Sequence, residues 1–270
     1  MKIGFIGTGN MASAIILGAV KSNFIPGNDI YLYDVFTQKA QELSNEIDGN
    51  ACATATEAIK EVDIVFLAVK PNMIEKVLAD LKEEIVNQKK IVVSIAAGTT
   101  IDKLETNLSK QTPIIRVMPN VNAMINLGAA AVTGNTASNS EQVHYIIDLF
   151  ASIGKAWEVE EKDFSTFTAL AGSSPAYAYL FIDSLARAGV KHGIAKDKAL
   201  QYAAQAVLGS AQMILDSNEN PWTLIDRVCS PGGTTVAGLL KLEEEAFLAT
   251  VVKGIDATIA RDEELSQNSK

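Results

Sequence analysis

The sequence predicts an α/β protein in two parts, a doubly wound parallel sheet followed by an all-helical region. Two observations support this fold class. In the first half, short and nearly continuous apolar runs alternate with stretches of helical periodicity, which is typical of a parallel sheet covered on both faces. After Trp157 the strand signals fade, and alanine- and leucine-rich stretches with helical spacing take over. We therefore expect two domains, at residues 1–158 and 159–270.

Strands are predicted at the short apolar runs of residues 3–6, 30–33, 64–69, 91–96 and 114–118. Helices are predicted where apolar residues recur on one face. This spacing occurs at Ala12, Ile15, Ile16 and Ala19, at Val77, Leu78 and Leu81, and at Val143, Ile146, Ile147 and Phe150. Ser138 and Glu141 are expected to form the capping box of the last of these helices.

The helical region is predicted to be interrupted at residues 172–175, 192–193, 220–221 and 230–233, where glycine and proline occur. Its helices carry many small residues, for example in the spacing of Ala199, Tyr202, Ala203 and Ala206. Such helices pack closely, either against one another or against a copy in another subunit. The sequence leaves these two arrangements open.

The composition excludes several classes of partner. The formal net charge of -9 argues against nucleic acid, which requires clustered lysine and arginine. No apolar stretch is long enough to span a bilayer, and the N-terminus leads directly into a strand, so we expect neither a membrane segment nor a signal peptide. Cys52 and Cys229 show no metal-type spacing, and we expect no metal site and a cytoplasmic location.

A glycine-rich loop lies between the first strand and the first helix. It reads Gly7, Thr8, Gly9, Asn10, Met11, Ala12. Gly7 permits a tight turn, Gly9 lets the backbone approach a pyrophosphate, and the small Ala12 lets the helix pack close to the strand. A simple turn is the alternative for a Gly-x-Gly pair, but the strand–loop–helix–strand context favours a Rossmann-type dinucleotide site.

Asp34 follows the second strand, at the position where a carboxylate binds the adenine ribose hydroxyls and repels a 2′-phosphate. It slightly favours NADH over NADPH. NADPH remains possible, because Thr37 and Lys39 could accommodate a phosphate. The alternative is a solvated loop acid.

A second loop of interest lies in the helical region, from Ser230 to Thr235. Two glycines free its backbone to turn N–H groups toward one point, and two threonine hydroxyls add donors where the next helix begins. Such a loop binds a carboxylate without a positive side chain. The alternative is a plain connector between two helices.

Several segments, in the right order along the chain, resemble pyrroline-5-carboxylate reductases. They are Phe66-Leu67-Ala68-Val69-Lys70-Pro71, Ser94-Ile95-Ala96-Ala97-Gly98, Arg116-Val117-Met118-Pro119-Asn120, Ala171-Gly172-Ser173-Ser174-Pro175-Ala176-Tyr177, and the stretch from Val228 to Leu239. The Ser-Pro-Gly-Gly-Thr-Thr part of the last segment is the most specific. The sequence departs from the family pattern at Val121-Asn122, Ser174 and Ala55.

The resemblance implies a cofactor domain followed by a helical dimerisation domain that interlocks with a second subunit, in a homodimer or a larger assembly of dimers. It also implies the roles of individual residues. Ser230, Gly232, Gly233, Thr234 and Thr235 would bind the substrate carboxylate, with Thr235 near the ring nitrogen as the catalytic group. Val69, Lys70, Pro71, Ala96 and Ala97 would line the ribose and nicotinamide of the cofactor.

The expected reaction is hydride transfer from NAD(P)H to the imine carbon of 1-pyrroline-5-carboxylate, giving proline. A protonated imine is already electrophilic, so orientation and exclusion of water matter more than a strong general base. Reduction of a six-membered cyclic imine is a near alternative. A nucleotide-binding regulatory protein without turnover is a more distant one, which an intact Ser230–Thr235 loop disfavours.

Overall fold

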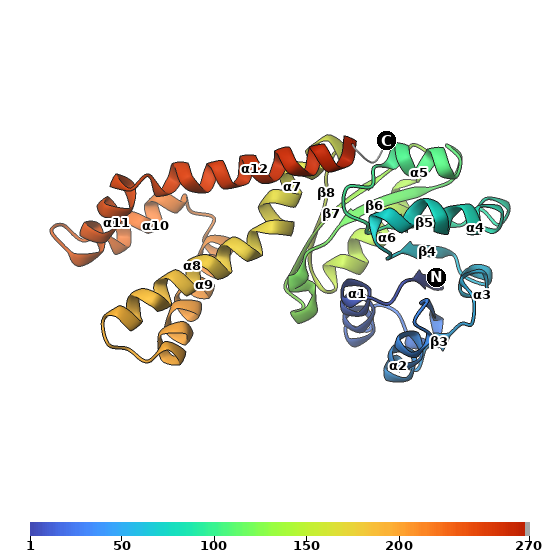
Figure 1. Ribbon diagram of the computed structural model, residues 1–270, viewed down its shortest axis with the longest axis horizontal. Helices are drawn as coiled ribbons and strands as arrows, with labels where there is room; N and C mark the ends of the chain where they lie inside the picture. Colours follow the sequence, from blue (N-terminus) through green and yellow to red (C-terminus); the bar gives the residue numbers. More distant parts are fainter. Residues whose placement is uncertain (268–270) are drawn as a thin grey trace. The chain divides into compact units, whose positions relative to one another are not determined.

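The computed structural model describes residues 1–267 and divides the chain into two compact units (Figure 1). The first unit comprises residues 1–173 and the segment from Ile259 onward, and the second comprises Ser174–Thr258. The predicted division after residue 158 falls at the end of the last strand, Gly154–Glu158.

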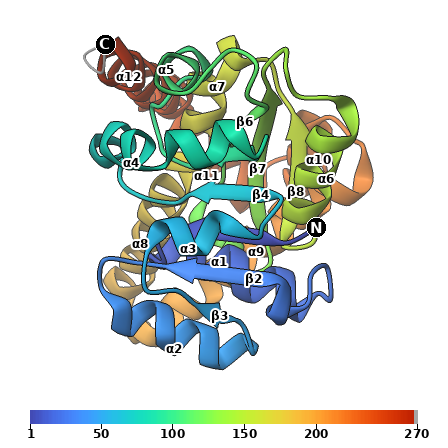
Figure 2. The same cartoon turned by 90° about the vertical axis from the view of Figure 1, so that its right-hand side faces the viewer.

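The first unit is built on one eight-stranded sheet. Its strands are Ile3–Ile6 (β1), Ile30–Tyr33 (β2), Asn50–Ala51 (β3), Ile64–Leu67 (β4), Ile91–Ser94 (β5), Ile114–Met118 (β6), Gly128–Gly134 (β7) and Gly154–Glu158 (β8). They lie in the order β3-β2-β1-β4-β5-β6-β7-β8, with β3 and β2 toward the lower edge in Figure 2. All neighbours are parallel except β6 and β7. The carboxyl ends of β1, β4, β5 and β6 therefore share one edge of the sheet.

Helices cover both faces of this sheet. They are Asn10–Lys21 (α1), Thr37–Ile47 (α2), Ala55–Lys60 (α3), Ile74–Asn87 (α4), Ile101–Asn107 (α5) and Ser140–Ala151 (α6), with 3-10 turns at Gly27–Asp29 (η1), Pro71–Met73 (η2) and Val121–Ile125 (η3). Ile3 and Phe5 point to the core shared with α1, α2 and α6, whereas Ile6 belongs to the core shared with α3, α4 and α5. The period of two in a strand places these side chains on opposite faces. The predicted doubly wound sheet is confirmed.

Three strands had no clear signal in the sequence. β3 has only two residues, β7 is largely glycine and alanine, and β8 mixes polar and apolar residues. In addition, β4 and β5 each end two residues earlier than predicted, at Leu67 and Ser94. The residues after these ends leave the sheet as loops.

The capping box of α6 is formed one residue later than predicted. Asn139 accepts the backbone N–H of Gln142 at 2.9 Å, and the Gln142 side chain accepts the N–H of Asn139 at 3.0 Å. The predicted cap, Ser138, instead donates its hydroxyl to the carbonyl of Ile114 at 3.0 Å. The Ser138–Glu141 prediction was therefore wrong, because Ser138 is recruited by β6 before the helix begins.

A continuous helical segment follows β8. It comprises Glu161–Asp163 (η4), Phe164–Phe167 (α7), the π-helix Thr168–Ser173 (η5) and Ser174–Lys191 (α8). The break predicted at 172–175 is therefore wrong. Pro175 is the second residue of α8 and, having no N–H, donates no hydrogen bond to the turn before it. A π-helical turn is uncommon and often marks a functional site.

The second unit is entirely helical, as predicted. After α8 come Lys196–Ser217 (α9), Pro221–Val228 (α10), Thr234–Glu244 (α11) and the first part of Phe247–Gln267 (α12). The predicted breaks at 192–193, 220–221 and 230–233 are confirmed. Gly189 and Ala199 allow α8 and α9 to approach closely, since a Cβ on Gly189 would lie 2.9 Å from the Ala199 Cβ.

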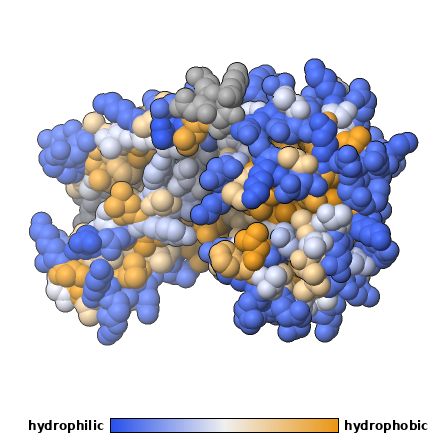
Figure 3. Space-filling model, turned by 45° about the vertical axis from the view of Figure 1, so that its right-hand side comes forward, coloured by the Kyte–Doolittle hydropathy of each residue, from blue (hydrophilic) through white to orange (hydrophobic). Residues whose placement is uncertain are grey.

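Few side chains of this second unit are buried within one chain. Many of its large apolar side chains are exposed, including Leu180, Leu208, Ile214 and Leu240, and hydrophobic residues appear on its surface at the left of Figure 3. An exposed apolar surface of this kind is typical of an interface. None of the helices within residues 1–267 combines the length and apolarity that crossing a membrane requires.

Candidate active site

The glycine-rich loop has the backbone that its sequence requires. Gly7 has φ +103°, and a Cβ there would lie 2.6 Å from the carbonyl oxygen of Ala68. Gly9 caps α1, no side chain satisfies the first N–H groups of this helix, and a Cβ on Gly9 would meet nothing within 4 Å. The helix N-terminus therefore presents free donors and a partial positive charge to open space, which suits a phosphate.

Three loops at the carboxyl edge of the sheet enclose a cavity of about 250 Å³ beside this helix. It is lined by Gly9, Asn10, Met11 and Ala12 after β1, by Ala68, Val69, Lys70 and Pro71 after β4, and by Ile95, Ala96 and Ala97 after β5. Nine of the predicted cofactor residues thus meet at one place, and Ala68 and Ile95 join them. A crevice at the carboxyl ends of parallel strands is the usual ligand site of such sheets.

The other three predicted cofactor residues form the support of this loop. The Asp34 carboxylate accepts the backbone N–H of Thr8 at 2.8 Å and the Thr8 hydroxyl at 3.1 Å, both at Oδ2. Its Oδ1 accepts the N–H of Phe36 at 2.9 Å. Gly7 donates its N–H to the carbonyl of Tyr33 at 2.8 Å. Asp34 is therefore half-buried and attached to the glycine loop.

The predicted substrate loop lies between α10 and α11 in the second unit. Pro231 and Gly232 form the centre of a turn closed by a 2.9 Å hydrogen bond from the Gly233 N–H to the Ser230 carbonyl, and Gly232 has φ +68°. Gly233 caps α11 without a side-chain acceptor for the first N–H groups of the helix. Thr234 and Thr235 begin that helix and are exposed. Backbone N–H groups and two hydroxyls therefore remain available to an anion.

Asn120 is a buried polar residue to which the sequence assigned no role. It follows β6, and its Nδ2 donates to the carbonyl of Ala171 in the π-helix at 2.9 Å while its Oδ1 accepts the N–H of Ala129 at 3.0 Å. The only sequence signal was its place in the Met-Pro-Asn motif. Its partners are 51 and 9 residues away, so no local pattern revealed them.

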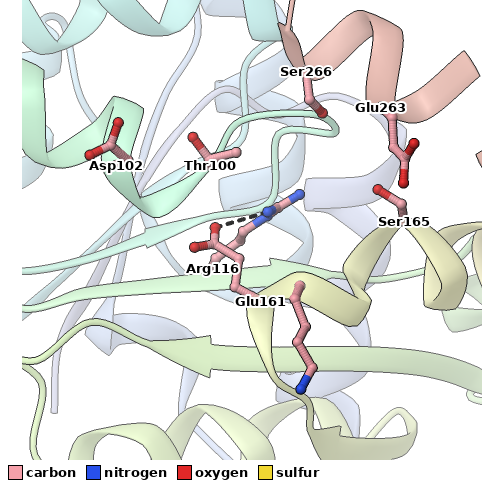
Figure 4. Close-up of a pocket in the computed structure, with 8 residues that line it drawn as sticks. Thr100, Asp102, Arg116, Glu161, Ser165, Glu263 and Ser266 are labelled. Carbon is pink, nitrogen blue, oxygen red and sulfur yellow. Dashed lines mark hydrogen bonds and ion pairs between the residues drawn. The ribbon is translucent and has the colours of Figure 1, made fainter. Parts of the chain in front are cut away.

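A larger polar cavity of about 630 Å³ lies elsewhere in the first unit (Figure 4). The residues that line it are Thr100, Asp102, Arg116, Glu161, Lys162, Ser165, Glu263 and Ser266. Figure 4 shows the ion pair between Arg116 and Glu161, with a separation of 2.9 Å. Acidic and basic groups are mixed along its walls, and none of the predicted site residues lines it.

Comparison with known proteins identifies both parts of the chain. Residues 161–265 match the family model for pyrroline-5-carboxylate reductase dimerisation, and residues 2–98 match the model for coenzyme F420-dependent NADP oxidoreductases. The pyrroline-5-carboxylate reductase of Escherichia coli K12 is 39% identical over 267 residues, which cover 99% of both chains.

Comparison with solved structures points to the same family. The 1-pyrroline-5-carboxylate reductase of Streptococcus pyogenes superposes with a TM-score of 0.87 at 42% identity, and the pyrroline carboxylate reductase of Plasmodium falciparum, solved with NADP bound, superposes with a TM-score of 0.89 at 32% identity. Each comparison covers 98% of both chains. With relatives of this kind along almost its whole length, this chain belongs to the pyrroline-5-carboxylate reductase family.

Proposed function

We propose that this protein reduces 1-pyrroline-5-carboxylate to L-proline with NAD(P)H, the last step of proline biosynthesis. The observation that carries the proposal is the presence, in one chain, of the cavity beside α1 and the Ser230–Thr235 turn at the start of α11. The first suits a dinucleotide and the second suits a carboxylate. Relatives named for this activity match the chain over almost its whole length.

The residues around the cavity suit a nicotinamide dinucleotide. The free N–H groups at the start of α1 would hold the pyrophosphate, with Gly9 leaving room for it. Val69, Lys70 and Pro71 would line the ribose, and Ala96 and Ala97 the nicotinamide. When bound, the nicotinamide supplies the hydride. The small alanines leave space for a flat ring and keep water away from it.

The Ser230–Thr235 loop would bind and orient the imine. Its backbone N–H groups and the hydroxyls of Ser230 and Thr234 bind the substrate carboxylate, which needs no lysine or arginine there. The Thr235 hydroxyl hydrogen-bonds the ring nitrogen. This contact holds the imine carbon in the orientation that accepts the hydride and contributes an orienting or proton-relaying group as the nitrogen becomes an amine.

Asp34 supports a preference for NADH. Its carboxylate, fixed by Thr8, stands where the adenine ribose is expected and would repel a 2′-phosphate. Lys39 is the nearby basic group that could favour NADPH, and it is exposed with its Nζ 5.4 Å from the centre of the Phe36 ring. We expect repulsion by the Asp34 carboxylate to outweigh attraction by Lys39, because hydrogen bonds hold Asp34 in position whereas the Lys39 side chain is exposed.

The helical part would assemble the enzyme. We take residues 159–270, of which 268–270 lie outside the described residues, as the substrate and dimerisation domain, and residues 1–158 as the cofactor domain. The exposed apolar side chains of α8, α9 and α11 favour a homodimer or a larger assembly of dimers. Two free cysteines agree with a reducing cytoplasm.

The test is a steady-state assay of nicotinamide absorbance with 1-pyrroline-5-carboxylate, run separately with NADH and NADPH. We expect turnover, and we expect Thr235→Ala to lower kcat roughly 10- to 100-fold. Thr235→Ser should retain most of the activity because it keeps the hydroxyl.

Thr250→Ala is the matched control, since Thr250 is an exposed threonine of the same unit whose hydroxyl donates to the carbonyl of Ala246, the residue just before its helix. Cofactor binding without turnover of this imine or its six-membered homologue would overturn the enzymatic function and favour a regulatory one.

A further inference from the structure

The helical segment that leaves the sheet is attached at two points to β6 and the residues just after it. At the start of the segment Glu161 pairs with Arg116, and ten residues later the carbonyl of Ala171 accepts a hydrogen bond from Asn120. The second attachment lies within the π-helix Thr168–Ser173. Gly172 adds to it, because a Cβ on this residue would lie only 2.9 Å from Cε of Met118. The π-helical turn therefore lies against the side chain of Met118, at the carboxyl end of β6.

Both polar atoms of the Asn120 side chain are hydrogen-bonded. Its side chain is buried, with 6% of its surface exposed. Ala129 offers an N–H and Ala171 offers a carbonyl, so only one orientation of the amide satisfies both partners. An acid of the same shape cannot replace it, because a carboxylate has no N–H to donate and would face the Ala171 carbonyl with like charge.

The position of this contact relates it to the cofactor cavity. β5 and β6 are parallel neighbours, with Ser94 opposite Arg116, so the chain segments that follow them leave the sheet side by side at the same edge. The segment after β5 is Ile95–Ala97, which lines the cavity where the nicotinamide is expected. The segment after β6 contains Asn120, which is hydrogen-bonded to the π-helical turn at Ala171.

We propose that Asn120 is a positioning residue for hydride transfer. By joining the N–H of Ala129 to the carbonyl of Ala171, it fixes the π-helical turn beside the segment that receives the nicotinamide. It acts through this turn, because Asn120 is not among the residues that line the cavity beside α1. Its role rests on the proposed function. A shift of the turn would reach the neighbouring Ile95–Ala97 segment through Met118, and hydride transfer is sensitive to the geometry of the reacting carbons.

Asn135, the residue after β7, provides a control at the amino end of β6. It is also buried, its Oδ1 accepts the N–H of Ile114 at 3.0 Å, and its Nδ2 donates to the carbonyl of Thr112 at 2.9 Å. Asn135→Asp removes a side-chain N–H that donates to a backbone carbonyl, as Asn120→Asp does, and it also removes the donor to Oε1 of Glu105 at 2.9 Å. It does so at the amino end of β6, away from the cavity edge.

The experiment compares wild type, Asn120→Asp and Asn135→Asp in the imine reductase assay, with thermal unfolding measured on each. We expect both variants to lower Tm, and Asn120→Asp alone to lower kcat, roughly 10- to 100-fold, with KM for the cofactor changed less than about twofold. Equal kcat values in the two variants would overturn the positioning role of Asn120 and leave the proposed function standing. Absence of turnover in the wild type would overturn the proposed function, and the role with it.

A second pair of variants tests the same turn if Asn120→Asp does not fold. Gly172→Leu places a side chain against Met118 that is too large for rotation of the flexible Met118 side chain alone to accommodate, and it does so without touching Asn120. We expect kcat to fall in the same direction. Met118→Ala removes the atoms that meet the new side chain, so the double variant should regain the kcat of Met118→Ala alone. An unchanged kcat in Gly172→Leu would overturn the proposal.

Discussion

Oε1 of Glu161 lies 2.9 Å from Nη1 of Arg116 and at the same time accepts the backbone N–H of Ile101 at 2.8 Å. Arg116 is buried in β6, and its guanidinium lies over the ring of Phe164 at 4.5 Å. One carboxylate oxygen thus joins β6, the start of α5 and the helical segment that leads to the π-helix. This junction holds the end of the sheet together, because each partner would otherwise leave a polar group without a bond.

Removing this carboxylate should destabilise the first unit. Glu161→Ala leaves the buried Arg116 without its ion-pair partner and should cost about 2 kcal/mol in the free energy of unfolding. Glu161→Gln keeps an oxygen acceptor and should cost less. Urea unfolding measures both.

The neighbouring Glu160→Ala is the control, because its ion pair with Lys162 is exposed and such pairs contribute little. Equal losses for positions 160 and 161 would contradict the role of the buried pair.

The cap of α6 should be Asn139 and not the residue before it. Asn139→Ala removes the acceptor of the Gln142 N–H and should lower the free energy of unfolding by about 1 kcal/mol. Glu141→Gln, at the position that the sequence favoured, should cost less than half as much, since Glu141 takes no part in the capping box. Thermal unfolding of the two variants decides between the two assignments.

Asp34 should govern the choice of cofactor. Asp34→Asn keeps an oxygen acceptor for Thr8 but removes the negative charge, so kcat/KM with NADPH should rise about tenfold relative to NADH. Asp48→Asn, a change of the same charge at the C-terminus of α2, should leave the ratio unchanged. A ratio that moves equally in both variants would indicate a general effect of net charge.

The two thiols should react at very different rates. Burial raises the pKa of the Cys52 thiol, which keeps it protonated and unreactive in the native protein. Because the folded state holds the Cys52 proton more tightly, this group favours unfolding once the pH exceeds its unfolded pKa of about 9. Titration with a thiol reagent near pH 8 should show one fast group, which disappears in Cys229→Ser, and one slow group. A fast phase that survives in Cys229→Ser would contradict the burial of Cys52.

Local patterns in the sequence were enough for much of the fold. The helix α1, the strands β1 and β2 and the glycine loop were all visible, because strand and helix periods and the turn glycines depend on neighbours a few residues away. The strands β3 and β7 were not visible. β3 is very short, and β7 is a run of small residues that becomes a strand only because β6 and β8 flank it.

The candidate site, too, was only partly predictable from the sequence. The residues that line the cavity beside α1, such as Gly9 and Ala96, were predicted from loop chemistry and from the resemblance to the family, and they meet at one place. The sequence placed Asp34 near the adenine ribose but did not reveal that its carboxylate holds the N–H of Thr8. Their separation of 26 residues is bridged only because β1 and β2 lie side by side.

The sequence by itself thus determined the class of fold, the glycine loop that suits a dinucleotide and the Ser-Pro-Gly-Gly-Thr-Thr turn, since each depends on short-range geometry. Only the tertiary structure decided that Asn120 bonds the carbonyl of Ala171 and that Arg116 pairs with Glu161, over separations of 51 and 45 residues. The physical reason is that a buried polar group must find a partner somewhere in the folded chain, and strand register, not sequence distance, determines which partner it finds.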